Sequence, residues 1–163
     1  MTDAGNDFDA FTGTDHDHER CVADAVAAAA ALCHRRGVRL TQIRRRVLEL
    51  VWASHNPVGA YDILDRLGQE RRRVAPPTVY RALEFLCAER LVHRIDSRNA
   101  FVGCAFPGAP HRAYFLICGR CGNAAEIDDR PLRLALDSLA ARAGFLVEQE
   151  TVELSGLCPQ CRA

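Results

Sequence analysis

Two cysteine pairs are the residues of this chain whose spacing points most directly to chemistry. Cys118-Gly-Arg-Cys121 and Cys158-Pro-Gln-Cys161 both have the CxxC pattern, which places two thiolates on one side of a metal ion. Zinc accepts four sulfur ligands at about 2.3 Å. The 36 residues between the pairs exceed a usual zinc-ribbon gap, so the intervening chain has to fold back. We expect a structural zinc site here, with a thiol switch as the rival interpretation.

The other cysteines are expected to be reduced. The first residues lack the basic and then apolar order of a secretion signal, and no apolar run approaches the ~20 residues of a membrane span. We therefore expect a cytoplasmic protein without a membrane partner, in which thiols do not pair as disulfides. Cys21, Cys33 and Cys87 fall in helical segments and are expected to be packing residues.

The formal net charge of zero hides a segregation of charge along the chain. All 21 basic residues are arginine. Residues 1–19 carry six acids and no base, residues 20–90 carry 13 arginines against seven acids, and residues 91–163 carry eight of each. The basic middle suits a polyanion such as DNA, because arginines set against phosphates release counterions. A solvated helical surface is the alternative that charge alone leaves open.

The N-terminal two thirds of the chain predict a DNA-binding fold. Residues 1–18 are polar and acidic and are expected to be a disordered tail. Helices are expected over residues 21–36, from the cap Thr41 to near Pro57, over residues 60–67 and over residues 76–87. The third of these is closed by Gly68, and its inward residues are either Tyr61, Leu64 and Leu67 or Ile63 and Leu67. Two short β-type runs, 91–95 and 100–103, then form a hairpin. Helices followed by a hairpin predict a winged helix-turn-helix domain over residues 19–103.

The rest of the chain predicts a second, smaller domain. Residues 104–110 are proline- and glycine-containing and are expected to be a hinge. Strands over 114–117 and 124–127, a helix over 131–143 and an alternating strand over 145–154 follow. Residues 111–163 are therefore expected to form a small α/β domain that holds the four cysteines. The whole fold is of the α+β class.

Several segments together resemble the ferric uptake regulator family, and within it the zinc uptake regulators. They are Arg39-Leu-Thr41, Ala60-Tyr-Asp-Ile-Leu64, the specific string PPTVYRALEFL over residues 76–86, Leu91-Val-His93, residues 115–122 and Gly156-Leu-Cys-Pro-Gln-Cys161. The resemblance implies a homodimer whose smaller domains pair and whose winged helices read a palindromic operator in double-stranded DNA. A family proline is missing from Thr41-Gln-Ile-Arg44. His111 stands alone where iron sensors carry a histidine run, which favours zinc.

The resemblance also implies a second metal site of mixed ligands. His93, Cys104, His111 and Glu126 match the family's zinc-sensing ligands. Two imidazoles, a thiolate and a carboxylate suit four-coordinate zinc. Each residue taken alone also has an ordinary structural role, as a surface or packing residue. With both sites filled, the chain would bind two Zn²⁺, and the mixed site would bridge the two domains.

The helix that starts at Pro76 is expected to enter the major groove. Thr78 and Arg81 lie opposite the apolar stripe of this helix, and Arg81 is the candidate that reads guanine. An ion pair of Arg81 with Glu84 is the structural alternative. Tyr61 is expected near DNA by resemblance, with core packing as its alternative. Further candidates, expected to contact phosphates, are Arg44, Arg45, Arg71, Arg72 and Arg73.

Together these features predict a zinc-responsive DNA-binding transcriptional regulator that represses zinc-uptake genes as a zinc-loaded dimer. The alternatives are a sensor of iron or manganese and a thiol-based redox regulator of the same family. An enzyme is not expected, because the sequence has neither the HxE and PCxxC arrangement of zinc deaminases nor an HExxH motif. Four protein ligands would also leave no open metal position for water, so no small-molecule substrate is expected.

Overall fold

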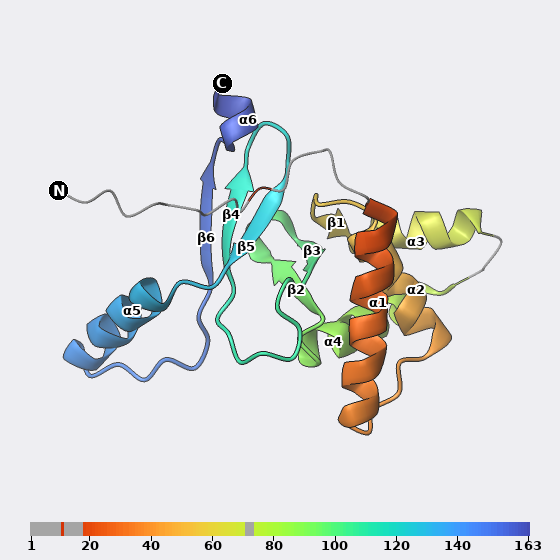
Figure 1. The fold of residues 1–163 in the computed structure, drawn as a ribbon, viewed down its shortest axis with the longest axis horizontal. Helices are drawn as coiled ribbons and strands as arrows, with labels where there is room; N and C mark the ends of the chain where they lie inside the picture. Colours follow the sequence, from red (N-terminus) through yellow and green to blue (C-terminus); the bar gives the residue numbers. More distant parts are fainter. Residues whose placement is uncertain (1–10, 12–17, 71–73) are drawn as a thin grey trace.

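The computed structural model of the chain describes Phe11, residues 18–70 and residues 74–163. Four helices and a short sheet form its N-terminal part, and a second sheet with two helices forms its C-terminal part (Figure 1). The predicted disorder of residues 1–18 falls almost entirely outside the described residues. Phe11 is an exception, since it is buried against Cys118, Ala125 and Cys158.

The four N-terminal helices are α1 (His18–Arg35), α2 (Gln42–Trp52), α3 (Ala60–Gln69) and α4 (Pro76–Ala88). Thr41 caps α2 as predicted, because its Oγ1 accepts a hydrogen bond from the Arg44 amide at 3.5 Å. For α3, the predicted end at Gly68 is wrong, and of the two predicted sets of inward residues the one with Ile63 and Leu67 is confirmed. Gly68 lies inside the helix, which the backbone hydrogen bond from Glu70 extends past it. Tyr61 faces solvent, whereas Ile63 and Leu67 fill the core.

The wing is a three-stranded antiparallel sheet. β2 (Val92–Ile95) and β3 (Ala100–Gly103) form the predicted hairpin, and β1 (Val58–Gly59) pairs with the other edge of β3. The turn between β2 and β3 is a short 3-10 helix over Asp96–Arg98, closed by Asn99 in the left-handed conformation (φ 46°). β1 was not predicted, because a two-residue strand has no periodicity for a sequence to show.

The C-terminal sheet has the strand order β5-β4-β6. β4 (Tyr114–Cys118) pairs antiparallel with β5 (Ala124–Ile127) and parallel with β6 (Val152–Gly156), and α5 (Arg130–Arg142) lies on the crossover to β6. A short helix, α6 (Pro159–Arg162), ends the chain. The strand predicted over 145–154 is wrong for residues 145–151, which lie outside the sheet. In the part of the chain that the structure describes, no neighbouring strand is available to pair with these residues, and Phe145 and Leu146 are exposed.

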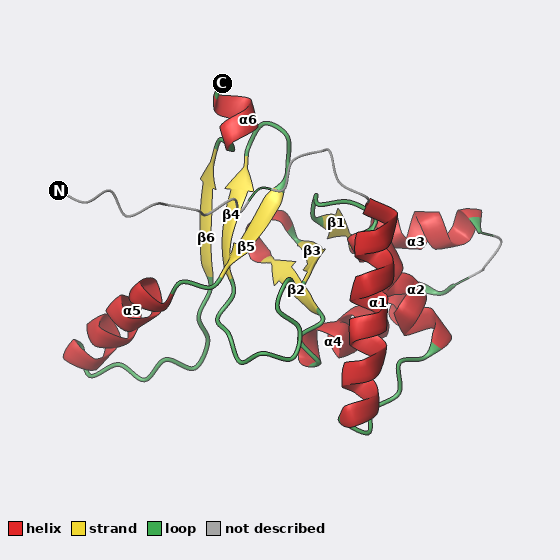
Figure 2. Cartoon of the chain, in the orientation of Figure 1, coloured by secondary structure: helices red, strands yellow, loops and turns green. Residues whose placement is uncertain are grey.

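The predicted α+β fold class, a winged helix joined to a small zinc-site domain, is confirmed. Helices dominate one part and strands the other (Figure 2). No helix within the described residues is long and apolar enough to cross a membrane. The two sheets contact each other through Ile95 of the wing, which packs in one buried cluster with Phe115, Ile117 and Ala124.

Candidate metal centres

The four cysteines of the CxxC pairs converge at one end of the C-terminal sheet. Cys118 ends β4, and its register partner on the parallel strand β6 is Gly156, two residues before Cys158. The sulfur atoms of all four cysteines lie within 4.8 Å of one another. The Sγ atoms of Cys121 and Cys158 are 3.8 Å apart, and a tetrahedron with bonds of 2.3 Å has edges of about 3.8 Å. The parallel pairing of β4 with β6 thus brings together two CxxC motifs that are far apart in the sequence.

Backbone amides hold the two cysteine turns in this geometry. Gly122 turns the first pair with a φ of 80°, which favours glycine. The Gly119 amide donates to the Gly156 carbonyl at 2.8 Å, and the Cys158 amide donates to the Cys118 sulfur at 3.4 Å. Amide hydrogen bonds of Cys121 and Cys158 lower the pKa of the Cys118 thiol to about 5. With four sulfur atoms in this arrangement, the cluster fits a zinc ion with no open position.

The mixed-ligand residues also come together, at the junction of the two domains. Glu126 Oε1 lies 2.8 Å from His111 Nε2 and 3.0 Å from His93 Nε2. The two Nε2 atoms are 3.4 Å apart, and the Cys104 sulfur is 3.5 Å from His111 Nε2. Nitrogen ligands at about 2.0–2.1 Å from a tetrahedral zinc lie about 3.3–3.4 Å apart. The four ligand atoms therefore surround a point that fits a zinc ion.

Neighbouring groups set the protonation of these ligands. His111 Nδ1 lies 2.8 Å from the Ala109 carbonyl; a carbonyl only accepts, so Nδ1 carries the proton and the Nε2 lone pair faces the cluster. Burial and the Glu126 carboxylate raise the pKa of the Cys104 thiol to about 12. Burial alone would raise the pKa of Glu126, but the hydrogen bond and charge of His93 outweigh it and hold that pKa below its usual value.

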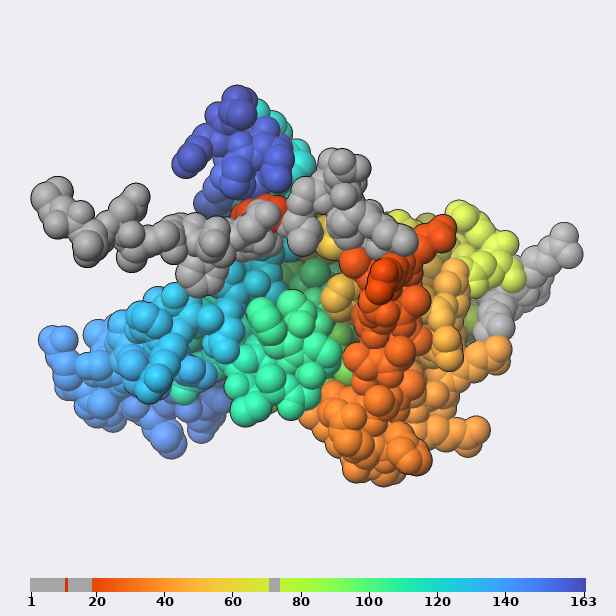
Figure 3. Space-filling model, viewed as in Figure 1, coloured from red at the N-terminus to blue at the C-terminus, as the bar shows by residue number. Residues whose placement is uncertain are grey.

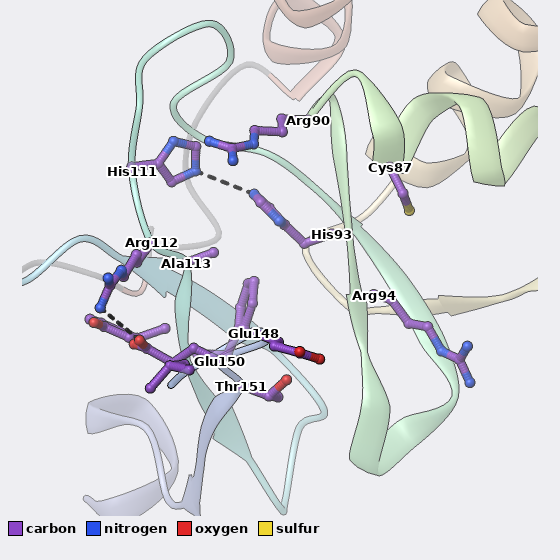
Figure 4. A pocket seen from close by; sticks show the side chains of 13 residues that line it. Cys87, Arg90, His93, Arg94, His111, Arg112, Ala113, Glu148, Glu150 and Thr151 are labelled. Carbon is purple, nitrogen blue, oxygen red and sulfur yellow. Dashed lines mark hydrogen bonds and ion pairs between the residues drawn. The ribbon is translucent and has the colours of Figure 1, made fainter. Parts of the chain in front are cut away.

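A cleft of about 460 Å³ opens beside the mixed cluster. Figure 4 shows His93, from the wing, and His111, from the C-terminal part, facing each other at its wall. The side chains of His111 and Glu126 are 2% and 3% exposed, whereas that of His93 is 18% exposed. A hydrated ion can therefore reach the cluster from the His93 side while the other ligands stay shielded from water.

The candidate DNA-contacting residues lie on the helical part of the molecule. Thr78 and Arg81 are exposed on α4, and the described residues include no ion pair of Arg81 with Glu84. Tyr61 on α3 is 71% exposed, so the alternative of core packing is wrong. Arg44 lies 3.6 Å over the Phe85 ring, and Arg45 pairs with Glu49 at 3.2 Å.

The contacts of Arg44 and Arg45 within the protein do not test whether these residues bind DNA, so their DNA roles stay predictions. The pair of Arg45 is exposed, and an exposed ion pair exchanges readily for a phosphate. Arg44 joins α2 to α4 through its ring contact and donates to the Arg39 carbonyl at 2.6 Å. Arg71, Arg72 and Arg73 lie outside the described residues.

The ferric uptake regulator family model matches residues 35–155 of this chain. The chain belongs to the ferric uptake regulator family. Within this family, it is 37% identical over 139 residues to the zinc uptake regulation protein of Escherichia coli K12, covering 85% of this chain and 81% of that protein. A structure of a zinc uptake regulator complexed with zinc and DNA aligns with a TM-score of 0.82 at 37% identity, covering 86% of this chain and 95% of that one.

Another family member, XcZur, has been solved in two forms. The holo form aligns with a TM-score of 0.78 at 45% identity, over 85% of this chain and 97% of that one. The apo form aligns with a TM-score of only 0.52 at 43% identity, over 87% and 98%. Because the sequence identity and the coverage are almost equal for the two forms, the difference between their TM-scores reflects a difference in conformation. The arrangement described here is similar to the holo form.

Two polar contacts between elements carried no signal in the sequence. Arg112, next to His111, lies 2.7 Å from both Asp137 of α5 and Glu150, and so ties these segments to the start of β4. Glu153 of β6 accepts hydrogen bonds from the wing turn. Their partners are 25 to 57 residues away in the chain, and no spacing rule relates such distant charges.

Proposed function

We propose that this member of the ferric uptake regulator family is a zinc-responsive transcriptional regulator that binds operator DNA when zinc-loaded and represses zinc-uptake genes. One observation carries the proposal above the others. His93 of the wing and Glu126 of the C-terminal sheet point at the same position, with Cys104 and His111 completing a four-ligand cluster between the domains. The relatives named zinc uptake regulators, one of them solved with zinc and DNA, support zinc as the metal and DNA as the partner.

In this proposal the chain has two zinc sites of different character. Cys118, Cys121, Cys158 and Cys161 hold a structural ion that stabilises the C-terminal domain. His93, Cys104, His111 and Glu126 hold a regulatory ion, whose chemical contribution when bound is a coordinate link between the domains. Residues 104–110 act as the hinge between domains 19–103 and 111–163. The structure is more similar to the holo form of XcZur than to its apo form, which supports the proposal that the two domains are arranged here as in a metal-bound protein.

We further propose that the C-terminal domains pair as a homodimer. α5 has no buried residue, and exposed apolar side chains gather on it and on the following segment; this region forms a lobe beyond the sheet (Figure 3). Among the described residues, β6 is an edge strand with one unpaired side. A second copy would cover both features and supply the two-fold axis that a palindromic operator requires. The apolar residues concerned include Leu134, Leu139, Phe145, Leu146 and Leu154.

For DNA, we propose that α4 lies in the major groove. Arg81 has its guanidinium free to bond guanine O6 and N7 together, with Thr78 beside it and Tyr61 of α3 close to the same duplex. Arg44, Arg45, Arg71, Arg72 and Arg73 are proposed to contact phosphates or to steer the encounter. Selection of duplexes from a random pool tests the function as a whole: a palindrome should be enriched in the presence of zinc and not after chelation.

The same selection tests the role of Arg81. Arg81→Ala should relax the preference at one base pair of each half-site, because a bidentate arginine contact contributes about 1–3 kcal/mol of discrimination. Arg45→Ala is the matched control; it should weaken binding to all sequences alike and lower the salt slope. Zinc content should be unchanged in both variants. An Arg81→Ala protein that selects the same palindrome with the same stringency would show that another residue reads this base.

Zinc binding at the mixed site should release the proton of Cys104. Its thiol has a pKa of about 12 without metal, so it is protonated between pH 7 and 9, and the ion has to displace about one proton. The apparent zinc affinity should therefore rise about tenfold per pH unit over this range. Competition with a chromophoric chelator at pH 7, 8 and 9, using protein with its four-cysteine site filled, measures the slope. An affinity that does not change with pH would exclude Cys104 as a ligand.

A further inference from the structure

Three side chains form a row across one face of the C-terminal sheet. Phe115 on β4 has Glu126 as its register partner on β5 and Glu153 as its partner on β6. Laterally paired residues of neighbouring strands place their side chains on the same face of a sheet. Glu126, Phe115 and Glu153 therefore lie side by side, with the two carboxylates at the ends of the row.

The wing lies along this row, and each member of the row contacts it. Glu126 contacts His93 at 3.0 Å within the mixed cluster. Phe115 packs with the fully buried Ile95. At the far end, the Glu153 carboxylate accepts hydrogen bonds from the backbone amides of Asp96 at 2.6 Å and Ser97 at 3.1 Å. The wing is thus attached at the metal cluster, at an apolar centre and at a carboxylate.

The chemistry at Glu153 is that of a helix cap supplied from another domain. The first amides of a helical turn have no partner within the turn, and here the turn Asp96–Arg98 begins at the two amides that Glu153 bonds. Hydrogen bonds to an ionised acceptor are stronger than neutral ones. Burial alone would raise the pKa of Glu153, but the hydrogen bonds of Ser97 and Asp96 hold it below its usual value, so Glu153 is a carboxylate at neutral pH.

We propose that Glu153 is a positioning residue that fastens the wing turn to the C-terminal sheet. Zinc at the opposite end of the row supplies the second attachment, so that the two together fix the orientation of the wing relative to the dimer. With one end released, the wing would be held by the other end and by the apolar contact of Ile95 with Phe115, and could rotate about the line through these two points. Because both attachments favour the same arrangement, each strengthens the other by linkage. The inference rests on the proposed regulatory role of the mixed site.

The first test reads the contact itself and needs no DNA. Amide hydrogen exchange of zinc-loaded protein, followed by NMR, should show Asp96 and Ser97 protected in the wild type. In Glu153→Ala, exchange at both amides should be about tenfold faster or more, because a hydrogen bond to a charged group is lost. Glu148→Ala is the matched control, since it removes the same charge five residues away from an exposed side chain; protection should persist. Unchanged protection in Glu153→Ala would overturn the proposal.

The second test measures the consequence for binding, with the palindromic duplex selected by the zinc-loaded wild type as probe. Glu153→Ala should keep its four-cysteine zinc, bind zinc at the mixed site about tenfold more weakly, and bind the duplex about tenfold more weakly at saturating zinc. Wild-type values for both would refute the role of Glu153. A wild type whose DNA binding ignores zinc would instead refute the proposed function.

A fallback variant covers the case in which Glu153→Ala aggregates. Glu153→Gln has the same size but a neutral group with only one acceptor oxygen, so it should show a smaller but measurable loss of protection at Asp96 and Ser97. Full protection in Glu153→Gln would contradict the proposal, because the attachment would then depend on neither the charge nor the second acceptor.

Discussion

Cys118→Ser is expected to leave the C-terminal domain without a stable fold. Cys118 is buried, and among the described residues its cluster has Phe11, Ala125 and Cys158 as further buried members, while Phe115, Ile117 and Ala124 of the same sheet form a second small cluster with Ile95 of the wing. So small a core depends on the metal, and the apparent free energy of a structural zinc site, about 10–16 kcal/mol, is as large as the whole stability of an ordinary domain, about 5–15 kcal/mol. Sedimentation velocity should show a dimer for the wild type, and aggregate or monomer for the variant.

Cys21→Ser provides the control for this experiment. Cys21 lies on α1 and belongs to neither metal cluster, so its replacement should leave the dimer, the zinc content and the far-ultraviolet circular dichroism unchanged. Zinc content of Cys118→Ser measured by mass spectrometry should fall, because a site with three thiolates holds the ion less firmly. A Cys118→Ser protein that remains a folded, DNA-competent dimer would show that the four-cysteine cluster is not structural.

His111→Ala is expected to give the largest functional effect while preserving the fold. His111 contacts each of the other three ligands of the mixed cluster, so its loss should remove the regulatory ion and with it the link between the domains. At saturating zinc, operator affinity should fall about 100- to 1,000-fold, corresponding to about 2.7–4.1 kcal/mol. Fluorescence anisotropy with a labelled operator duplex measures the loss.

The control is His34→Ala, which removes an exposed histidine at the end of α1 and should respond to zinc as the wild type does. Circular dichroism and sedimentation should show His111→Ala to be a folded dimer that retains the four-cysteine zinc. If such a protein still bound the operator tightly and in a zinc-dependent manner, regulation would have to act through other ligands.

Features with local signals could be predicted from the sequence. The CxxC spacing identifies the four cysteines without any relative, because each pair is a local turn. The caps, prolines and apolar stripes of α2 and α4 likewise predict both helices. The mixed site is different, since His93, Cys104, His111 and Glu126 come from separate elements and no spacing relates them. Only the resemblance to the family brought these four residues together before the structure was known.

Other features depend on packing between distant segments and were not predicted. Glu153 is an ordinary acidic residue of a strand until the wing turn is placed over it. Periodicity alone left open whether Tyr61 or Ile63 faces the core, because the pattern of a short helix fits either face. The failed strand over residues 145–151 shows that alternation predicts a strand only where a neighbour is available to pair with.

The most direct test of this account is operator binding by wild-type protein that carries the four-cysteine zinc but not the mixed-site zinc. Mild chelation should give this form, because the mixed site lies beside an open cleft; mass spectrometry should show one zinc per chain instead of two. The stripped form should bind a palindromic operator about 100- to 1,000-fold more weakly than the zinc-loaded form. When free zinc, iron or manganese is added back in buffered steps, zinc should restore binding at a lower free concentration than iron or manganese. Equal affinity of the stripped and loaded forms would contradict the proposal that the ion at His93, Cys104, His111 and Glu126 is the effector.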